Sequence, residues 1–164
     1  MFYNRNEGIG RVYQNVSIKD SLNNIIITGN FAEHIEREDR SLVTDSAVLI
    51  QIYDGDSLFL HADTLLAITE VDSAKEDSIV EKKKLLAYPN VRFYKYDIQG
   101  KCDSLAYNYS DSTMVMHHSP ILWSEENQLT AITISINTGG GQLKSLFMEN
   151  YSFIVSENDT DSFN

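Results

Sequence analysis

The chain has 164 residues, which is the size of one domain and enough to enclose a hydrophobic core. Its 24 acidic and 13 basic residues give a net charge of −11. That charge argues against nucleic acid or an anionic membrane surface as the main partner, because both are held by Lys and Arg. No apolar run approaches the roughly 18 residues of a membrane-spanning helix, and no signal-peptide segment opens the chain. We interpret residues 1–164 as a single domain that is a piece of a longer protein.

An apolar pair spaced two residues apart recurs along the chain and predicts short strands. The pairs are Val16/Ile18, Val48/Ile50, Val91/Phe93, Ile121/Trp123 and Phe153/Val155. A second pattern alternates with them, in which a small residue stands between aliphatic residues. These small residues are Gly29, Ala62, Cys102 and Ala131. The alternation, with a period of about 30 residues, predicts an all-β stack of two-strand repeats.

The second pattern changes phase after its small residue, since Leu60 and Ala62 have even numbers whereas Leu65 and Ala67 have odd numbers. A strand changes phase only where an extra residue is inserted, so the pattern predicts a bulge or corner at this point.

The small residues at these corners, Ala62, Cys102 and Ala131, are therefore expected to be buried. Cys102 is the only cysteine, so it forms no internal disulfide. Asp63 and Asp103 follow two of the small residues, and we expect their carboxylates to accept hydrogen bonds from the backbone.

One segment departs from the repeat. Residues 69–85 are highly charged, include the lysine run at 82–84 and lengthen one repeat by about ten residues. The composition predicts a protruding loop or short helix, with the lysines on a solvated face or, as the alternative, in contact with an anionic partner.

Motifs for enzyme chemistry are absent from the sequence. The histidines at 34, 61, 117 and 118 have no metal-ligand spacing, and the glycines at 139–141 precede no phosphate-loop lysine. We expect no catalytic residue, no metal and no cofactor. The alternative that stays open is a glycan-acting β-solenoid enzyme using Asp63 and Asp103 as an acid/base pair.

The ten residues of the apolar pairs are expected to face one interior. That interior is either a filled core between two sheets, as in a structural scaffold that pairs with partner domains, or an apolar trough that accepts acyl chains. The sequence alone leaves both alternatives open.

Three stretches stand out, at residues 56–65 (DSLFLHADTL), 87–94 (AYPNVRFY) and 98–107 (IQGKCDSLAY). They resemble the OstA family, which includes the periplasmic LptA protein and the N-terminal domain of LptD. The likeness is greatest to the larger OstA-like proteins of Bacteroidota-type bacteria. It implies a β-jellyroll, in which two antiparallel sheets form a twisted, V-shaped trough. It also implies a periplasmic, non-enzymatic role in lipopolysaccharide transport to the outer membrane, with end-to-end stacking on similar domains or on further copies of the chain.

The resemblance makes the ten apolar-pair residues candidate ligands of acyl chains. Arg92, Lys95 and Lys101 fall close together in one repeat and are candidate contacts for phosphate groups, or else ordinary solvated strand residues. Because lipopolysaccharide and this chain are both anionic, affinity has to come from burying acyl chains, at about 0.8 kcal/mol per CH₂ before ordering costs.

Overall fold

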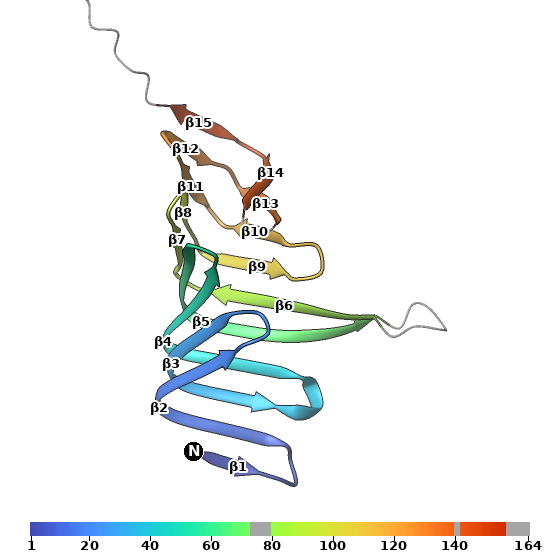
Figure 1. Cartoon of the computed structure of the whole chain (residues 1–164). Coiled ribbons are helices and arrows are strands. Elements are labelled where there is room, and N and C mark those ends of the chain that lie inside the picture. Colours follow the sequence, from blue (N-terminus) through green and yellow to red (C-terminus); the bar gives the residue numbers. More distant parts are fainter. Residues whose placement is uncertain (73–79, 140–141, 157–164) are drawn as a thin grey trace, which may run out of the picture.

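The computed structural model describes residues 1–72, 80–139 and 142–156, and it is all-β (Figure 1). A single antiparallel sheet contains the fifteen strands of this described part of the chain. The only helical element among the described residues is a 3-10 turn at Glu36–Glu38. No helix in this part of the chain is long and apolar enough to cross a membrane. The predicted all-β class is confirmed.

The first six strands are β1 (Phe2–Asn4), β2 (Ile9–Asp20), β3 (Ile25–Ile35), β4 (Arg40–Tyr53), β5 (Asp56–Asp72) and β6 (Val80–Tyr88). The next five are β7 (Val91–Lys95), β8 (Ile98–Cys102), β9 (Ser104–Asn108), β10 (Thr113–His117) and β11 (Ile121–Ser124). The last four are β12 (Asn127–Thr130), β13 (Thr133–Gly139), β14 (Gln142–Glu149) and β15 (Phe153–Ser156).

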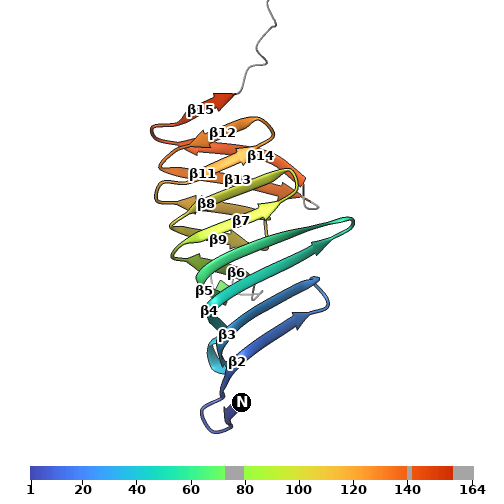
Figure 2. The same cartoon turned by 90° about the vertical axis from the view of Figure 1, so that its left-hand side faces the viewer.

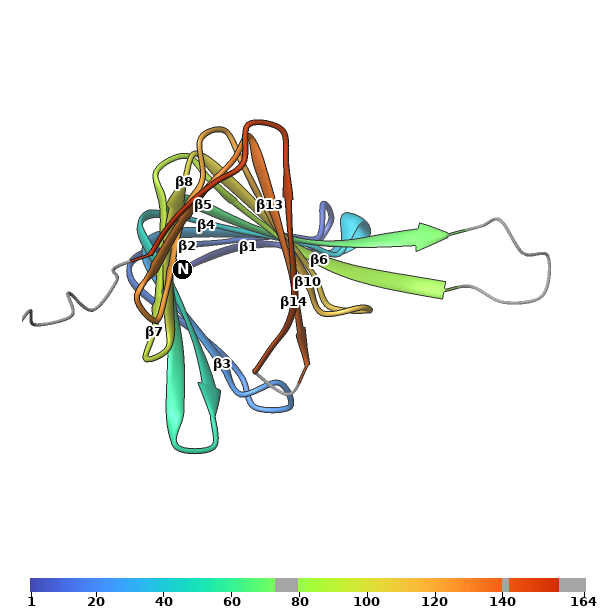
Figure 3. The same cartoon turned by 90° about the horizontal axis from the view of Figure 1, so that it is seen from above.

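The sheet curls into a half-barrel with two walls (Figure 3). The first wall contains β7, β8, β11, β12 and β15, and the second contains β6, β9, β10, β13 and β14. Strands β2 to β5 are long enough to run through both walls, and β5 pairs with β7 in one wall and with β6 in the other. The two predicted sheets are therefore the two walls of one continuous sheet, and together they form a trough.

The chain turns between the walls at corners of two kinds. Where it passes from the second wall to the first, non-glycine residues adopt positive φ: Gln14 and Asn15, Asp45 and Ser46, Asn90, His118 and Ser119, and Asn150 and Tyr151. Most of these are Asn, Asp or Ser, which tolerate the left-handed region better than branched residues do.

Where the chain passes from the first wall to the second, the corners contain the predicted small residues. Ala62 and Cys102 are buried, and Ala131 is half-buried against the core near the C-terminal end of the stack. At Gly29 an added Cβ would lie 2.6 Å from Cγ1 of Val43, so only glycine fits. The predicted corners and phase shifts are confirmed, including the register shift of the β3–β4 pair between Thr28 and Phe31.

Apolar side chains fill the angle where the walls meet. On the second wall, cross-strand partners from Leu65 through Ala87, Leu105 and Met116 to Ile134 form one row, and all are almost completely buried. Leu60 and Leu122 close the angle from the first wall. The deep part of the trough is thus a packed core.

The charged segment at 69–85 extends a hairpin. Strand β5 continues to Asp72 and β6 starts at Val80, and the pair projects from the second wall (Figures 1 and 3). The described part of the segment is strand; the loop or short helix predicted for its middle falls on residues 73–79, which lie outside the described residues.

Candidate functional site

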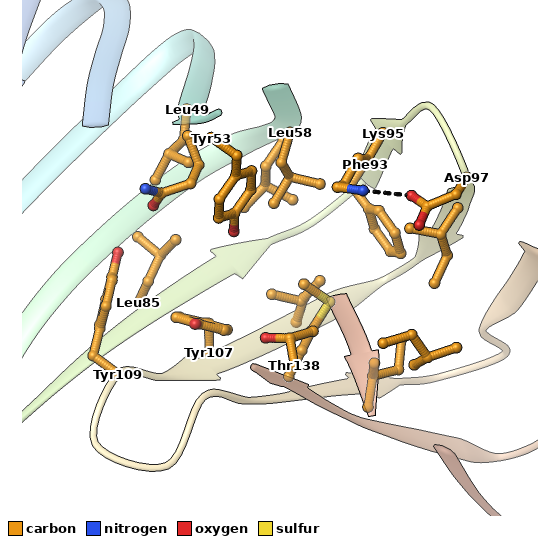
Figure 4. A pocket seen from close by; sticks show the side chains of 17 residues that line it. Leu49, Tyr53, Leu58, Leu85, Phe93, Lys95, Asp97, Tyr107, Tyr109 and Thr138 are labelled. Atoms are coloured by element: carbon orange, nitrogen blue, oxygen red, sulfur yellow. Dashed lines mark hydrogen bonds and ion pairs between the residues drawn. The ribbon is translucent and has the colours of Figure 1, made fainter. Parts of the chain in front are cut away.

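Away from the angle where they meet, the two walls diverge toward the ends of their strands and leave a cavity between them (Figure 4). The first wall contributes Tyr53, Leu58 and Phe93, and the second contributes Leu85 and Tyr107. The cavity has a volume of about 60 Å³ and a mostly apolar lining. A space of roughly 10–15 Å³ on this measure holds one water molecule, so the cavity has room for only a few waters and is narrow as it stands.

A second cavity of about 250 Å³ lies next to the first, toward the N-terminal end of the stack. Ile25 and Ile27 line it from the first wall, and Leu65 lines it from the second. Leu85 and Tyr109 border both cavities, which makes them neighbours along one trough. We refer to the two cavities together as the trough mouth.

An ion-pair cluster borders the first cavity. The ammonium of Lys95 donates to Oδ1 of Asp97 at 2.6 Å and lies 3.2 Å from Oδ2 of Asp56 (Figure 4 shows the Asp97 contact). Burial alone would lower the pKa of Lys95, but its bonds to Asp97 and Asp56 outweigh burial and raise that pKa. The pKa of Asp56 is lowered, first by the backbone N–H of Ser57 and then by Lys95. The cluster ties the β4–β5 hairpin to the β7–β8 hairpin.

Burial affects two of the tyrosines that line the trough mouth. Burial raises the pKa of Tyr109 to about 12, and it also raises the pKa of Tyr53. The rings of Tyr107 and Tyr109 meet edge to face with their centroids 4.8 Å apart. These side chains therefore offer ring surface, and no negative charge, to a bound molecule.

The rim of the second cavity carries charges of both signs. Lys83 and Lys84 line it, as do Asp20 and Asp39, and Lys84 is paired with Glu70 at 2.6 Å. Hydrogen bonds from Asn23 lower the pKa of Asp20. Part of the lysine run thus borders a cavity, whereas the sequence favoured a solvated face over contact with an anionic partner.

The predicted ligand residues separate into two groups. Val16, Ile18, Val91 and Phe93 face the interior; Ile18 and Phe93 line the trough mouth, whereas Val16 and Val91 belong to the packed core.

The prediction that all ten face the interior is wrong for the other six. Val48 and Ile50 are in register with His61 and Phe59 on the outer face. Ile121 and Trp123 are in register with Lys101 and Gln99 on the same face. Phe153 and Val155 continue these two outer rows on β15 and are exposed.

The reason lies at the corners. The first residue after each left-handed corner points inward. This residue is a valine in two repeats (Val16 and Val91), whereas the other three repeats have Ala47, Pro120 and Ser152 at this position. Ala47 and Pro120 are buried, and they are followed two places later by the buried Leu49 and Leu122. A slip of one residue reverses the face of a whole strand.

The candidate phosphate contacts do not converge on the trough. Arg92 and Lys101 are cross-strand partners on the outer face of the first wall. Lys95 points to the inner side, where Asp56 and Asp97 already neutralise it.

The other candidate residues have structural surroundings. The carboxylate of Asp63 accepts a hydrogen bond from the side-chain amide of Asn90 at 2.7 Å, and Oδ2 of Asp103 lies 4.0 Å from Nδ1 of His118. At the Asp63 corner, a side-chain amide thus takes the place of the predicted backbone donor. Burial raises the pKa of the Cys102 thiol to about 12. No group of three potential metal ligands occurs among the described residues.

Sequence reasoning missed several residues of the trough mouth, namely Leu58, Leu85, Tyr107 and Tyr109. Leu58 and Tyr107 belong to the small-residue pattern, which by itself predicts only strands and corners. Their inward phase, shared with Leu60 and Leu105, is the signal that could have identified them.

A scan against protein-family models gives no match to this chain, and a search of curated proteins gives none either.

Proposed function

We propose that this domain is a non-enzymatic binding module that holds the acyl chains of an amphipathic lipid in the trough mouth. The observation that carries the proposal is a pair of neighbouring, largely apolar cavities between two walls, sharing Leu85 and Tyr109. The resemblance to the OstA family identifies lipopolysaccharide as the expected lipid, in a periplasmic bridge that serves outer-membrane assembly.

Acyl burial supplies the affinity. Each CH₂ that leaves water contributes about 0.8 kcal/mol, before the cost of ordering the chain. The second cavity, of about 250 Å³, is the larger of the two and offers the entry for a chain, whereas the first, of about 60 Å³, must widen. An acyl chain therefore enters beside Ile25 and Ile27 and extends toward Tyr107.

Charge sets where the lipid headgroup lies. The chain is strongly acidic overall, so an anionic headgroup needs local cations. Lys83 at the rim of the second cavity is suited to this role, because Lys84 and Lys95 are already paired with carboxylates and Arg92 and Lys101 lie on the outer face.

Both ends of the stack support partnership with similar domains. At the C-terminal end, Phe147 is 67% exposed and Phe153 is 63% exposed, and at the N-terminal end Phe2 is 54% exposed. An open sheet edge with exposed apolar residues is a template for pairing with another strand. End-to-end stacking, on further copies or on other jellyroll domains, would cover them.

Photo-crosslinking tests the binding proposal. A photoreactive phenylalanine analogue at Tyr53, in the trough mouth, is expected to form an adduct with lipopolysaccharide in cells. The same analogue at Tyr88, which lies on the outer face of the second wall, serves as the matched control. Equal labelling from both positions, or none from Tyr53 in a folded protein, would contradict the proposal.

A structural scaffold is the second candidate, and the packed core in the angle of the trough favours it. A Leu58→Asp variant separates the two functions. It places an unpaired carboxylate in the trough mouth and should abolish lipid crosslinking, while a pure scaffold would keep its partner association. Circular dichroism of the variant establishes that it is folded.

A further inference from the structure

The outer face of the first wall carries two adjacent rows of unlike character (Figure 2 shows this wall from outside). One row runs from Phe59 through Tyr94 and Gln99 to Trp123, each the cross-strand partner of the next. The second row, two residues away along each strand, runs from His61 through Arg92 to Lys101. A largely aromatic row thus lies beside a row of basic side chains, of which Arg92 and Lys101 are charged.

The two rows border a hollow of about 540 Å³. This volume falls in the range of roughly 300–1,000 Å³ that is usual for small-molecule sites. Within the described parts of the chain no carboxylate lines the hollow, although the chain has 24 acidic residues and 13 basic ones. Local charge is therefore opposite in sign to that of the whole chain.

The two charged side chains of the second row, Arg92 and Lys101, have no carboxylate partner among the described residues. Arg92 and Lys101 lie directly opposite each other on β7 and β8, and like charges in that position destabilise a sheet. Among the described residues, neither forms a salt bridge. An anion placed between them would remove their repulsion and form charge-assisted hydrogen bonds with both.

The aromatic row is exposed and partly held in place. Tyr94 is 53% exposed and Phe59 is 45% exposed. The indole N–H of Trp123 donates to Oε1 of Gln128 at 2.9 Å, and the ammonium of Lys101 lies 5.9 Å from the centre of the indole ring. The indole and the tyrosine ring lie in one row on the outer face, with Gln99 between them in the register, and each offers ring surface on which the apolar face of a sugar can stack.

We propose that this outer face is a second binding site, for an anionic saccharide. The sugar rings stack along Tyr94 and Trp123, and a carboxylate or phosphate of the saccharide lies between Arg92 and Lys101. The site is on the opposite face of the sheet from the trough mouth, so it does not depend on lipid binding there.

Titration of the fluorescence of Trp123, the only tryptophan, tests the proposal directly. The probes are trigalacturonate (carboxylated), glucose 6-phosphate (phosphorylated), maltotriose (neutral) and inorganic phosphate (the anion alone). We expect a saturable change with trigalacturonate or glucose 6-phosphate at millimolar concentrations. The stronger of these two identifies the anionic group. Maltotriose and inorganic phosphate should each bind about tenfold more weakly, or about 1.4 kcal/mol.

Two variants separate the contributions of the rows. The double variant Arg92→Gln/Lys101→Gln should bind the anionic saccharide at least tenfold more weakly and should bind maltotriose with unchanged affinity. Tyr94→Ala should weaken the binding of the anionic saccharide and of maltotriose. Lys19→Gln, on the same face but several strands away, and Tyr88→Ala, on the other wall, are the controls and should bind like wild type.

Three results would overturn the proposal: no saturable change with either anionic probe, inorganic phosphate binding as tightly as the saccharides, or unchanged binding in both site variants. None of these affects lipid crosslinking from Tyr53, so the proposal for the trough mouth can fail or stand separately.

Discussion

The ring of Phe93 occupies the space that a side chain at position 100 would need. Phe93 and Gly100 are cross-strand partners on β7 and β8, and an added Cβ would lie 2.6 Å from Cε1 of the ring. The methyl group of Met116 would be 3.1 Å away on the other side. Gly100 thus lets a large aromatic side chain reach into the core between two strands.

Gly100→Ala is therefore expected to overpack this part of the core and to cost about 1–3 kcal/mol of folding free energy. Gly10→Ala is the matched control, because its added Cβ would meet only the ring of Tyr3 at 3.6 Å. Urea denaturation of both variants measures the difference. In a double-mutant cycle, Phe93→Leu should recover part of the loss in the Gly100→Ala background. Identical midpoints for the two glycine variants would contradict this account of the core.

Neighbouring positions on β11 test the assignment of inner and outer faces. Leu122 is fully buried, so Leu122→Asp places an unpaired carboxylate in the core and should unfold the domain. Ile121 points to the outer face, and Ile121→Asp should leave the circular dichroism spectrum and lipid crosslinking from Tyr53 unchanged. If Ile121→Asp were the more damaging of the two, the register described here would be wrong.

The same pair of positions shows what the sequence could and could not predict. Alternation and phase shifts reveal the strands and the corners at Ala62 and Cys102, because both are local properties of the backbone. Which side chains of a strand point to the inner face depends on which residue comes first after the corner. At Ala47 and Pro120 that residue is small, and the larger apolar neighbours dominate the pattern instead. The trough mouth requires the two walls to be placed together, which no local pattern specifies.

The Cys102 thiol should resist modification in the folded domain. Its pKa is raised to about 12 by burial, so at neutral pH almost no thiolate is present. Reaction with a thiol reagent should require unfolding, so that the rate of labelling rises as urea destabilises the domain. Cys102→Ala should be tolerated, whereas Cys102→Leu should cost about 1–3 kcal/mol by overpacking the corner. Fast labelling of the native protein at neutral pH would show that the corner is open.

The raised pKa of Cys102 also predicts a loss of stability at alkaline pH. In the unfolded chain the thiol releases its proton near the ordinary cysteine pKa of 9.0, whereas the folded chain retains it up to about 12. The unfolded state is therefore favoured as pH rises above 9, and stability falls across this window. The decline should be less steep for Cys102→Ala in urea melts between about pH 8 and about pH 11. If the stability of both proteins fell equally steeply with pH, the ionisation of other groups would be the cause of the decline.

The Lys95 cluster should contribute stability only where its carboxylates are charged. The pKa of Asp56 is lowered from 3.8 in the folded state, so this contribution is present above that value and is lost as pH falls through the lower, folded pKa. Lys95→Met should reduce the urea midpoint at neutral pH, and the difference from wild type should shrink at about pH 2. Lys19→Met, which removes an exposed charge on the outer face, should have no such pH dependence. A constant difference at both pH values would exclude the ion pairs as its cause.

The ends of the stack should mediate self-association. Phe147 and Phe153 are exposed at the C-terminal end and Phe2 at the N-terminal end, so a contact between the two ends is heterologous and can repeat. We expect wild-type protein to sediment as a concentration-dependent series of oligomers in analytical ultracentrifugation. Phe147→Lys and Phe2→Lys should each shift the series toward monomer, because a charge at an open edge opposes strand pairing. Tyr88→Lys, which lies in the middle of the second wall, should leave the series unchanged. A single monomeric species at every concentration would mean that the ends need a different domain as their partner.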